Sequence, residues 1–185
     1  YAALEHGREA LRPDADLAAA FPRAVKRLAV AVEALPTVLN GRIMPGQTDR
    51  YAFEAKAGQR IVVAAVTRGL IPFIADGVPG WFQANLSLAD ADGRELAFAD
   101  NRHHDQDPVI SCEIPADGRY LLSIRDVIYR GREDFVYRIT IGEIPLVTSR
   151  FPLGGRRGRR TEGVVVTGVN LTGRQLTVPM DRELS

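Results

Sequence analysis

The chain has 185 residues, of which 45% are hydrophobic and 25% are charged, and its net charge is +1. These values are ordinary for a globular protein and allow a hydrophobic core. The near-neutral charge excludes a strong overall field that would attract nucleic acid or anionic lipid. No apolar run reaches the roughly 18 residues that a membrane-spanning helix needs, so we expect no membrane insertion.

Residues 1–35 differ from the rest of the chain in composition and hydrophobic pattern, and they suggest a linker or the tail of a preceding unit. The segment is rich in alanine, and Asp14 or Asp16 could cap a short helix. Residues 27–35 (RLAVAVEAL) also alternate well enough to form a strand, so both alternatives stay open. The chain starts at Tyr1 without a signal peptide, and we expect it to be a piece of a longer protein.

From residue 36 the apolar residues recur with a period of two, which is typical of strands. Glycine, proline and aspartate separate short apolar segments. The segments that we expect to contain strands are 37–43, 44–55, 60–68, 84–90, 95–100, 108–115, 119–126 and 134–144. Several short strands at regular spacing predict an all-β fold, namely an antiparallel, jelly-roll-like β-sandwich over residues 36–145. Residues 146–185 add strands after a Gly/Arg-rich turn and suggest the start of a second, Ig-like β unit, or strands that cover the first domain.

Two Asp-Gly pairs mark predicted turns between strands. Asp92-Gly93 lies between two alternating segments, and Asp117-Gly118 lies between two others. Tight hairpin turns need positive φ angles, which glycine and aspartate tolerate. We therefore interpret Asp90 and Asp92 as turn residues. Cys112 alternates with isoleucines and is interpreted as a small core residue rather than a catalytic thiol.

An acidic segment follows residue 99 and raises the possibility of a metal site. Its carboxylate and amide side chains are hard oxygen donors of the kind that Ca²⁺ prefers. The candidate ligands are Asp100, Asn101, Asp105 and Asp107, with help from Asp49 or Asp126. The spacing does not fit an EF-hand. The alternative is a solvated connecting loop.

Motifs for catalysis are weak. His103 and His104 are adjacent and would point to opposite sides of a strand, with no third histidine or cysteine nearby for zinc. No GxSxG motif is present. The arginines of the GGRRGRR segment (154–160) lack the interleaved aromatic residues of a nucleic-acid-binding surface. We therefore expect no enzyme and no nucleic-acid partner.

The loop that precedes residue 84 contains the single tryptophan and is the candidate ligand-binding site. Trp81, Phe82 and Phe73 could form an exposed aromatic platform, which Tyr129 would join if both loops lie at the same end. The alternative is that these rings close one end of the sandwich.

The segments 40–63, 86–101, 107–126 and 134–142 together resemble the bacterial pre-peptidase C-terminal domain, in order and in spacing. The resemblance is to divergent copies in large planctomycete-type surface or secreted proteins. The segment 151–171 resembles the opening strands of an Ig-like domain. This resemblance implies a secreted or cell-surface location, a jelly-roll fold, a non-catalytic accessory role, and family links to matrix or carbohydrate-like ligands and to calcium.

Two functions remain as hypotheses. The first is a module that binds a polysaccharide or a protein surface for an exported bacterial multidomain protein. The second is a structural spacer that stabilises neighbouring domains of the same chain, with or without Ca²⁺.

Overall fold

A computed structural model describes residues 29–70, 82–100, 107–153, 160–171 and 175–179. Of residues 160–163 and 175–179 it describes the backbone alone. The described residues form strands and one short 3₁₀ turn, η1 (Arg68–Leu70), and the all-β prediction is confirmed. No described helix is long and apolar enough to cross a lipid bilayer.

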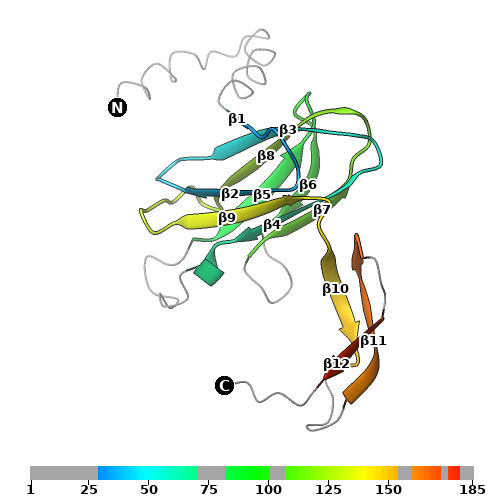
Figure 1. The fold of residues 1–185 in the computed structure, drawn as a ribbon. Helices are drawn as coiled ribbons and strands as arrows, with labels where there is room; N and C mark the ends of the chain where they lie inside the picture. Colours follow the sequence, from blue (N-terminus) through cyan, green and yellow to red (C-terminus); the bar gives the residue numbers. More distant parts are fainter. Residues whose placement is uncertain (1–28, 71–81, 101–106, 154–159, 172–174, 180–185) are drawn as a thin grey trace, which may run out of the picture.

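Two sheets, antiparallel except for one short parallel pair, form the sandwich (Figure 1). The first sheet has the order β1-β3-β8-β5-β6, with β1 (Val30–Ala31), β3 (Asp49–Ala55), β8 (Gly118–Asp126), β5 (Ala84–Ala89) and β6 (Glu95–Ala99). The second sheet has the order β2-β9-β4-β7, with β2 (Thr37–Arg42), β9 (Val136–Gly142), β4 (Arg60–Val66) and β7 (Val109–Glu113).

The pairing of the strands is nested. β2 pairs with β9, β3 with β8, β4 with β7, and β5 with β6, each time antiparallel. A long hairpin that is rolled up in this way, with alternate pairs in alternate sheets, is a jelly roll. The predicted jelly-roll sandwich is therefore confirmed.

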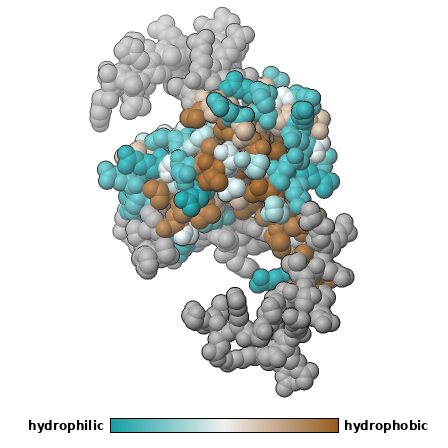
Figure 2. Space-filling model, in the orientation of Figure 1, coloured by the Kyte–Doolittle hydropathy of each residue, from teal (hydrophilic) through white to brown (hydrophobic). Residues whose placement is uncertain are grey.

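The core lies between the two sheets and follows from the alternation along each strand. On β5, Leu86 and Leu88 are fully buried, while Ser87 between them lies on the outer face and is partly exposed. Ile139 and Ile141 on β9 approach from the opposite sheet and are also fully buried. Figure 2 shows one face of the molecule, on which hydrophobic residues lie toward the middle and hydrophilic residues lie around them.

One short strand settles an alternative that the sequence left open. Val30 and Ala31 form β1, which pairs in parallel with Tyr51 and Ala52 of β3. Residues 30–31 therefore extend the first sheet as an edge strand. Residues 1–28, where a helix was the other alternative, lie outside the described residues.

A separate three-stranded sheet follows the sandwich (Figure 1). It has the order β10-β11-β12, with β10 (Leu146–Phe151), β11 (Arg160–Val169) and β12 (Gln175–Pro179). At the junction, the Asn170 side chain donates hydrogen bonds to the carbonyl oxygens of Arg60 (2.8 Å) and Ile144 (3.2 Å). The domain limits and the Ig-like character of this second unit stay predictions.

The hairpin turn between β5 and β6 is built as the Asp-Gly pattern predicts. Gly93 has a φ of 86°. One carboxylate oxygen of Asp90 accepts hydrogen bonds from the backbone N–H groups of Asp92 and Arg94, both at 2.9 Å. Asp90 is thus a turn residue, which confirms that interpretation. Cys112 packs partly buried against the core, and burial raises the pKa of its thiol.

Candidate binding groove on the outer face of the first sheet

The outer face of the first sheet carries a hollow of about 250 Å³. It is lined by polar and aromatic side chains from four strands and from the segments that flank them: Thr48, Arg50, Asn85, Ser87, Glu95, Phe98, Ser123, Arg125 and Tyr129. We call this hollow the outer-face groove. It arises because the residues that alternate with the core positions of β3, β8, β5 and β6 all point away from the second sheet.

Strand register explains why residues distant in sequence meet here. Arg50 on β3 lies opposite Ser123 on β8, which lies opposite Ser87 on β5, which lies opposite Phe98 on β6. Such a row crosses three strand spacings, or about 14 Å. The groove is therefore as wide as the sheet from β3 to β6.

Two exposed aromatic rings flank the polar floor. Phe98 is 50% exposed and Tyr129 is 53% exposed. The Arg125 guanidinium lies 4.3 Å from the centroid of the Tyr129 ring, within cation–π distance. Exposed aromatic rings beside hydroxyl and amide groups can stack on an apolar ring face of a ligand while the polar groups take its hydrogen bonds.

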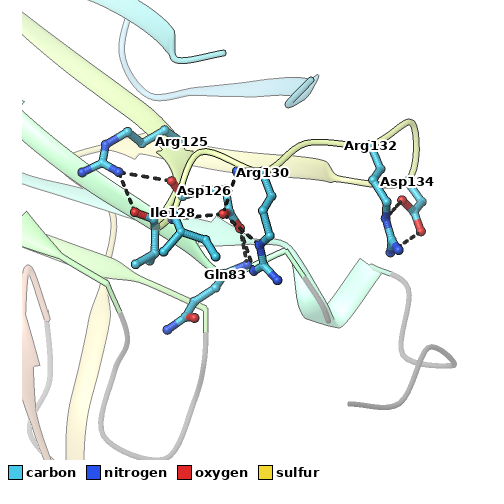
Figure 3. A network of polar contacts seen from close by, with 8 residues as sticks. Gln83, Arg125, Asp126, Ile128, Arg130, Arg132 and Asp134 are labelled. Carbon is cyan, nitrogen blue, oxygen red and sulfur yellow. Dashed lines mark hydrogen bonds and ion pairs between the residues drawn. The ribbon is translucent and has the colours of Figure 1, made fainter. Parts of the chain in front are cut away.

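A buried carboxylate positions Tyr129. Asp126, at the end of β8, is 0% exposed because it follows the inward-pointing positions of that strand. Its carboxylate accepts hydrogen bonds from the backbone N–H groups of Gln83, Ile128 and Arg130, at 3.1–3.2 Å (Figure 3). The Arg130 side chain adds two more through Nε and Nη2, at 3.1 and 3.0 Å. We call this arrangement the Asp126 cage.

The Asp126 cage determines the course of the 126–130 turn. The Tyr129 N–H donates to the Asp126 carbonyl (3.0 Å), and the Tyr129 carbonyl accepts from the Gly46 N–H (2.9 Å). Tyr129 is held at a φ of 60°, which is uncommon for a bulky residue. Strained backbone of this kind persists when the surrounding contacts over-determine it. The turn thereby places the Tyr129 ring at the groove.

Of the residues of the predicted aromatic platform, Tyr129 is exposed, whereas Phe82 is buried, in line with the alternative that these rings close one end of the sandwich. Phe82 is 3% exposed and stacks on Phe135, with ring centroids 5.1 Å apart. It joins the core because Gln83 anchors the start of β5 to Asp126, which turns the preceding side chain inward. Trp81 and Phe73 lie outside the described residues.

Two of the predicted calcium ligands, Asp107 and Asp49, are engaged by protein donors at separate places. The Asp107 carboxylate accepts hydrogen bonds from the N–H groups of Thr67, Arg68 and Gly69 and from the Thr67 hydroxyl, and so caps η1. Asp49 accepts from Gln47 and from the Tyr137 hydroxyl. Asp126, the other suggested helper, is enclosed in its cage.

No described residues form a cluster of three or more His, Cys, Asp and Glu side chains that could hold a metal. Asp100 is half-buried after β6, and Asn101 and Asp105 lie outside the described residues, as do His103 and His104. Binding of Ca²⁺ at 100–105 stays a prediction, and the aspartates engaged elsewhere do not fit it.

A larger hollow of about 530 Å³ lies beside β1 and the end of β3. Its described lining contains no aromatic side chain, and the Asp117 carboxylate there accepts a hydrogen bond from the Ala57 N–H. The outer-face groove is therefore the stronger candidate for a site. The sequence alone did not reveal the outer-face groove, because its lining residues come together only once the strand order is known. The polar residues that alternate with the core positions of β5 and β8 were the one signal of it in the sequence.

Comparison with known proteins gives one curated relative and several solved structures. A segment of 80 residues, 43% of the chain, is 34% identical to a probable subtilase-type serine protease of Deinococcus radiodurans. The chain spans about a tenth of the length of that protein. No family model matches the chain.

Two of the solved structures are bacterial β domains. The pre-peptidase C-terminal domain of a collagenase from Bacillus anthracis is 14% identical, with a TM-score of 0.43 over 61% of this chain and 95% of that domain. PliG of Aeromonas hydrophila, a periplasmic inhibitor of g-type lysozyme, is 17% identical, with a TM-score of 0.42 over 62% of this chain and 96% of PliG. A solved pre-peptidase C-terminal domain is thus among the structures to which this chain is similar, as the sequence motifs predicted.

Proposed function

We propose that the chain is a non-catalytic accessory module of an exported bacterial multidomain protein, and that it binds polysaccharide through the outer-face groove. The observation that carries the proposal is the pairing of exposed Phe98 and Tyr129 with a polar floor on one sheet face. The segment that is similar to a subtilase-type protease supports the accessory role and the exported location, because it covers only a small part of that enzyme.

The floor of the groove suits a sugar better than a protein surface. Ser87, Ser123 and Thr48 contribute hydroxyl groups and Asn85 contributes an amide. These groups can donate and accept hydrogen bonds, as sugar hydroxyls do. β5 and β8 each pair on both sides within the sheet, so the groove floor has no free strand edge to which a peptide could add.

Removal of the two aromatic rings tests this function. We expect Phe98→Ala and Tyr129→Ala each to weaken binding to immobilised polysaccharides about tenfold, which corresponds to about 1.4 kcal/mol. The matched control is Phe151→Ala, since Phe151 on β10 is 74% exposed and lies outside the groove. Trp81→Ala in the same assay tests the predicted role of Trp81.

The contrary outcomes separate the alternatives. Unchanged binding by the Phe98→Ala and Tyr129→Ala double variant would show that the groove is not the site. If the unaltered protein binds nothing in a panel of neutral, basic and acidic polysaccharides, polysaccharide binding is wrong and the spacer function is favoured.

A further inference from the structure

Two guanidinium groups in the outer-face groove have no carboxylate partner among the described residues. Arg50 donates to the Thr48 carbonyl at 3.3 Å. Arg125 donates through one nitrogen to the carbonyls of Asp126 (3.1 Å) and Val127 (3.0 Å). A guanidinium has five N–H donors, so each side chain keeps several for a ligand.

Two neighbouring arginines, unlike Arg50 and Arg125, form ion pairs with carboxylates. Arg130 pairs with Asp126 at 3.0 Å, and Arg132 pairs with Asp134 at 2.9 Å (Figure 3). In the same figure Arg125 points away from both pairs and toward main-chain carbonyls. The carboxylates near this turn are thus already taken.

The two unpaired cations are close enough to act together. Arg50 lies opposite Ser123, and Arg125 is two residues further along β8. Residues in this diagonal relation on one face are about 7–8 Å apart and are within reach of each other's long side chains. One carboxylate or sulfate group could therefore accept hydrogen bonds from both arginines.

Asn85 supplies an independent observation. It lies opposite Arg125 on β5, is 4% exposed and lines the groove. Its carboxamide makes no hydrogen bond with any residue that the structure describes. A buried amide that is left without a partner costs about 1–3 kcal/mol, so such a group is usually satisfied by a ligand, an ion or a water molecule. A ligand oxygen in the groove would satisfy the Asn85 N–H donors.

The charge balance of the groove is positive. Its described lining includes two arginines and one carboxylate, Glu95. Glu95 accepts a hydrogen bond from the Ser87 hydroxyl at 2.7 Å, on the β6 side of the groove and away from β3. An anionic ligand group is therefore favoured between β3 and β8.

We propose that the outer-face groove recognises an acidic saccharide, whose carboxylate or sulfate group binds Arg50, Arg125 and Asn85 while a sugar ring stacks on Tyr129. This inference rests on the proposed function and specifies its ligand class. Charge-assisted hydrogen bonds from arginine are about twice as strong as neutral ones, so the acidic group would supply much of the affinity.

The experiment compares two polymers that differ only in whether their carboxyl groups are free or methyl-esterified. Polygalacturonate and its fully methyl-esterified form have the same rings and linkages. We expect at least tenfold tighter binding of polygalacturonate by isothermal titration calorimetry, with a preference that shrinks as NaCl rises. Arg50→Gln and Arg125→Gln should each reduce this preference about tenfold, because each removes one of the charged donors to the carboxylate.

Two controls keep the result interpretable. Arg138→Gln removes the same charge from an exposed position on β9, in the second sheet, and should leave the preference intact. Arg125→Lys retains the charge and should retain part of the preference. Thermal unfolding shows whether each variant is folded, and Arg50→Gln provides an independent variant because its side chain has a single hydrogen bond to Thr48.

Each result supports or overturns the inference. Equal binding of the two polymers overturns it and leaves the proposed function standing. If polygalacturonate, alginate and chondroitin sulfate all fail to bind while a neutral polysaccharide binds, the acidic assignment is wrong. If poly-glutamate binds as tightly as polygalacturonate and depends on the same arginines, the ligand is an acidic peptide and the saccharide assignment is overturned.

Discussion

A pair of buried tyrosines shows how single residues tie the two sheets together. The hydroxyls of Tyr51 on β3 and Tyr137 on β9 are 2.5 Å apart, and the Tyr137 hydroxyl donates to Asp49 at 2.5 Å. Tyr137 is 1% exposed, and a Cβ added at Gly41 would overlap its phenol. Glycine at position 41 therefore leaves space for this contact.

Tyr137→Phe tests the contribution of this contact to stability. The variant leaves the Asp49 carboxylate and the Tyr51 hydroxyl with one partner fewer, and we expect it to lower the free energy of unfolding by about 1–3 kcal/mol. Urea unfolding at pH 7 measures this change. The matched control is Tyr120→Phe, since the Tyr120 hydroxyl donates only to the nearby Ala116 carbonyl. A change no larger than that of the control would contradict the expectation.

The same tyrosines predict the behaviour at alkaline pH. Burial raises the pKa of Tyr137, and the hydrogen bonds to Asp49 and Tyr51 raise it further; burial also raises the pKa of Tyr51. The unfolded chain loses these protons near pH 10 while the folded chain holds them. Their contribution to stability is therefore present below about pH 10 and is lost as the pH rises further. The decline should be shallower in Tyr137→Phe.

At the scale of elements, the strands followed from alternation and the turns from their Asp-Gly pairs. The core positions of β5, β8 and β9 were readable because one face of each is apolar. The strand β1 was not distinguishable from a helix, because its two residues gain stability only by pairing with β3. The partition of strands between sheets was likewise not readable, since it depends on contacts distant in sequence.

The Asp126 cage is the element whose role sequence could not predict. Asp126 was considered as a metal ligand, but the partners that occupy it come from the start of β5 and from the turn after β8. The sequence places Asp126 at an inward-pointing position at the end of a strand, but it does not indicate which groups donate hydrogen bonds to the carboxylate. The groove was missed for a similar reason, because Arg50 on β3 and Asn85 on β5 are brought to one face only through β8, which lies between their strands in the sheet.

Arg130→Met tests the cage. The variant keeps the aliphatic bulk but removes the two side-chain donors, and we expect it to lower the free energy of unfolding by about 1–3 kcal/mol. It should also weaken polysaccharide binding, because the turn that holds Tyr129 loosens. Arg132→Met is the control, since its partner Asp134 is partly exposed and such ion pairs contribute about 0–1 kcal/mol. Equal effects of both variants would count against a special role for the cage.

At the scale of the whole molecule, the remaining question is stabilisation by calcium. Asp49, Asp107 and Asp126 are occupied by protein donors, so the hypothesis now depends on Asp100, Asn101 and Asp105. A ligand that binds only the folded state raises stability, by about 2.7 kcal/mol at a hundred times its Kd.

The calcium hypothesis predicts that the Tm rises by several degrees in Ca²⁺ relative to chelator, and that Asp100→Asn reduces the rise. Differential scanning calorimetry measures both, with Mg²⁺ as the control ion. An identical Tm in calcium and chelator would rule out a stabilising site.

The nested strand pairing also determines how the module would respond to force. Thr37, where β2 begins, lies directly opposite Ile141 near the end of β9, so once the two-residue pairing of β1 with β3 has opened, the chain enters and leaves the nested strand pairs at adjacent points. Tension applied at these two points would break the β2–β9 hydrogen bonds one residue pair at a time, instead of loading all of them at once in shear. A module with adjacent entry and exit points adds little to the end-to-end length of a longer chain. Because its hydrogen bonds would break one pair at a time, we expect it to unfold at low force.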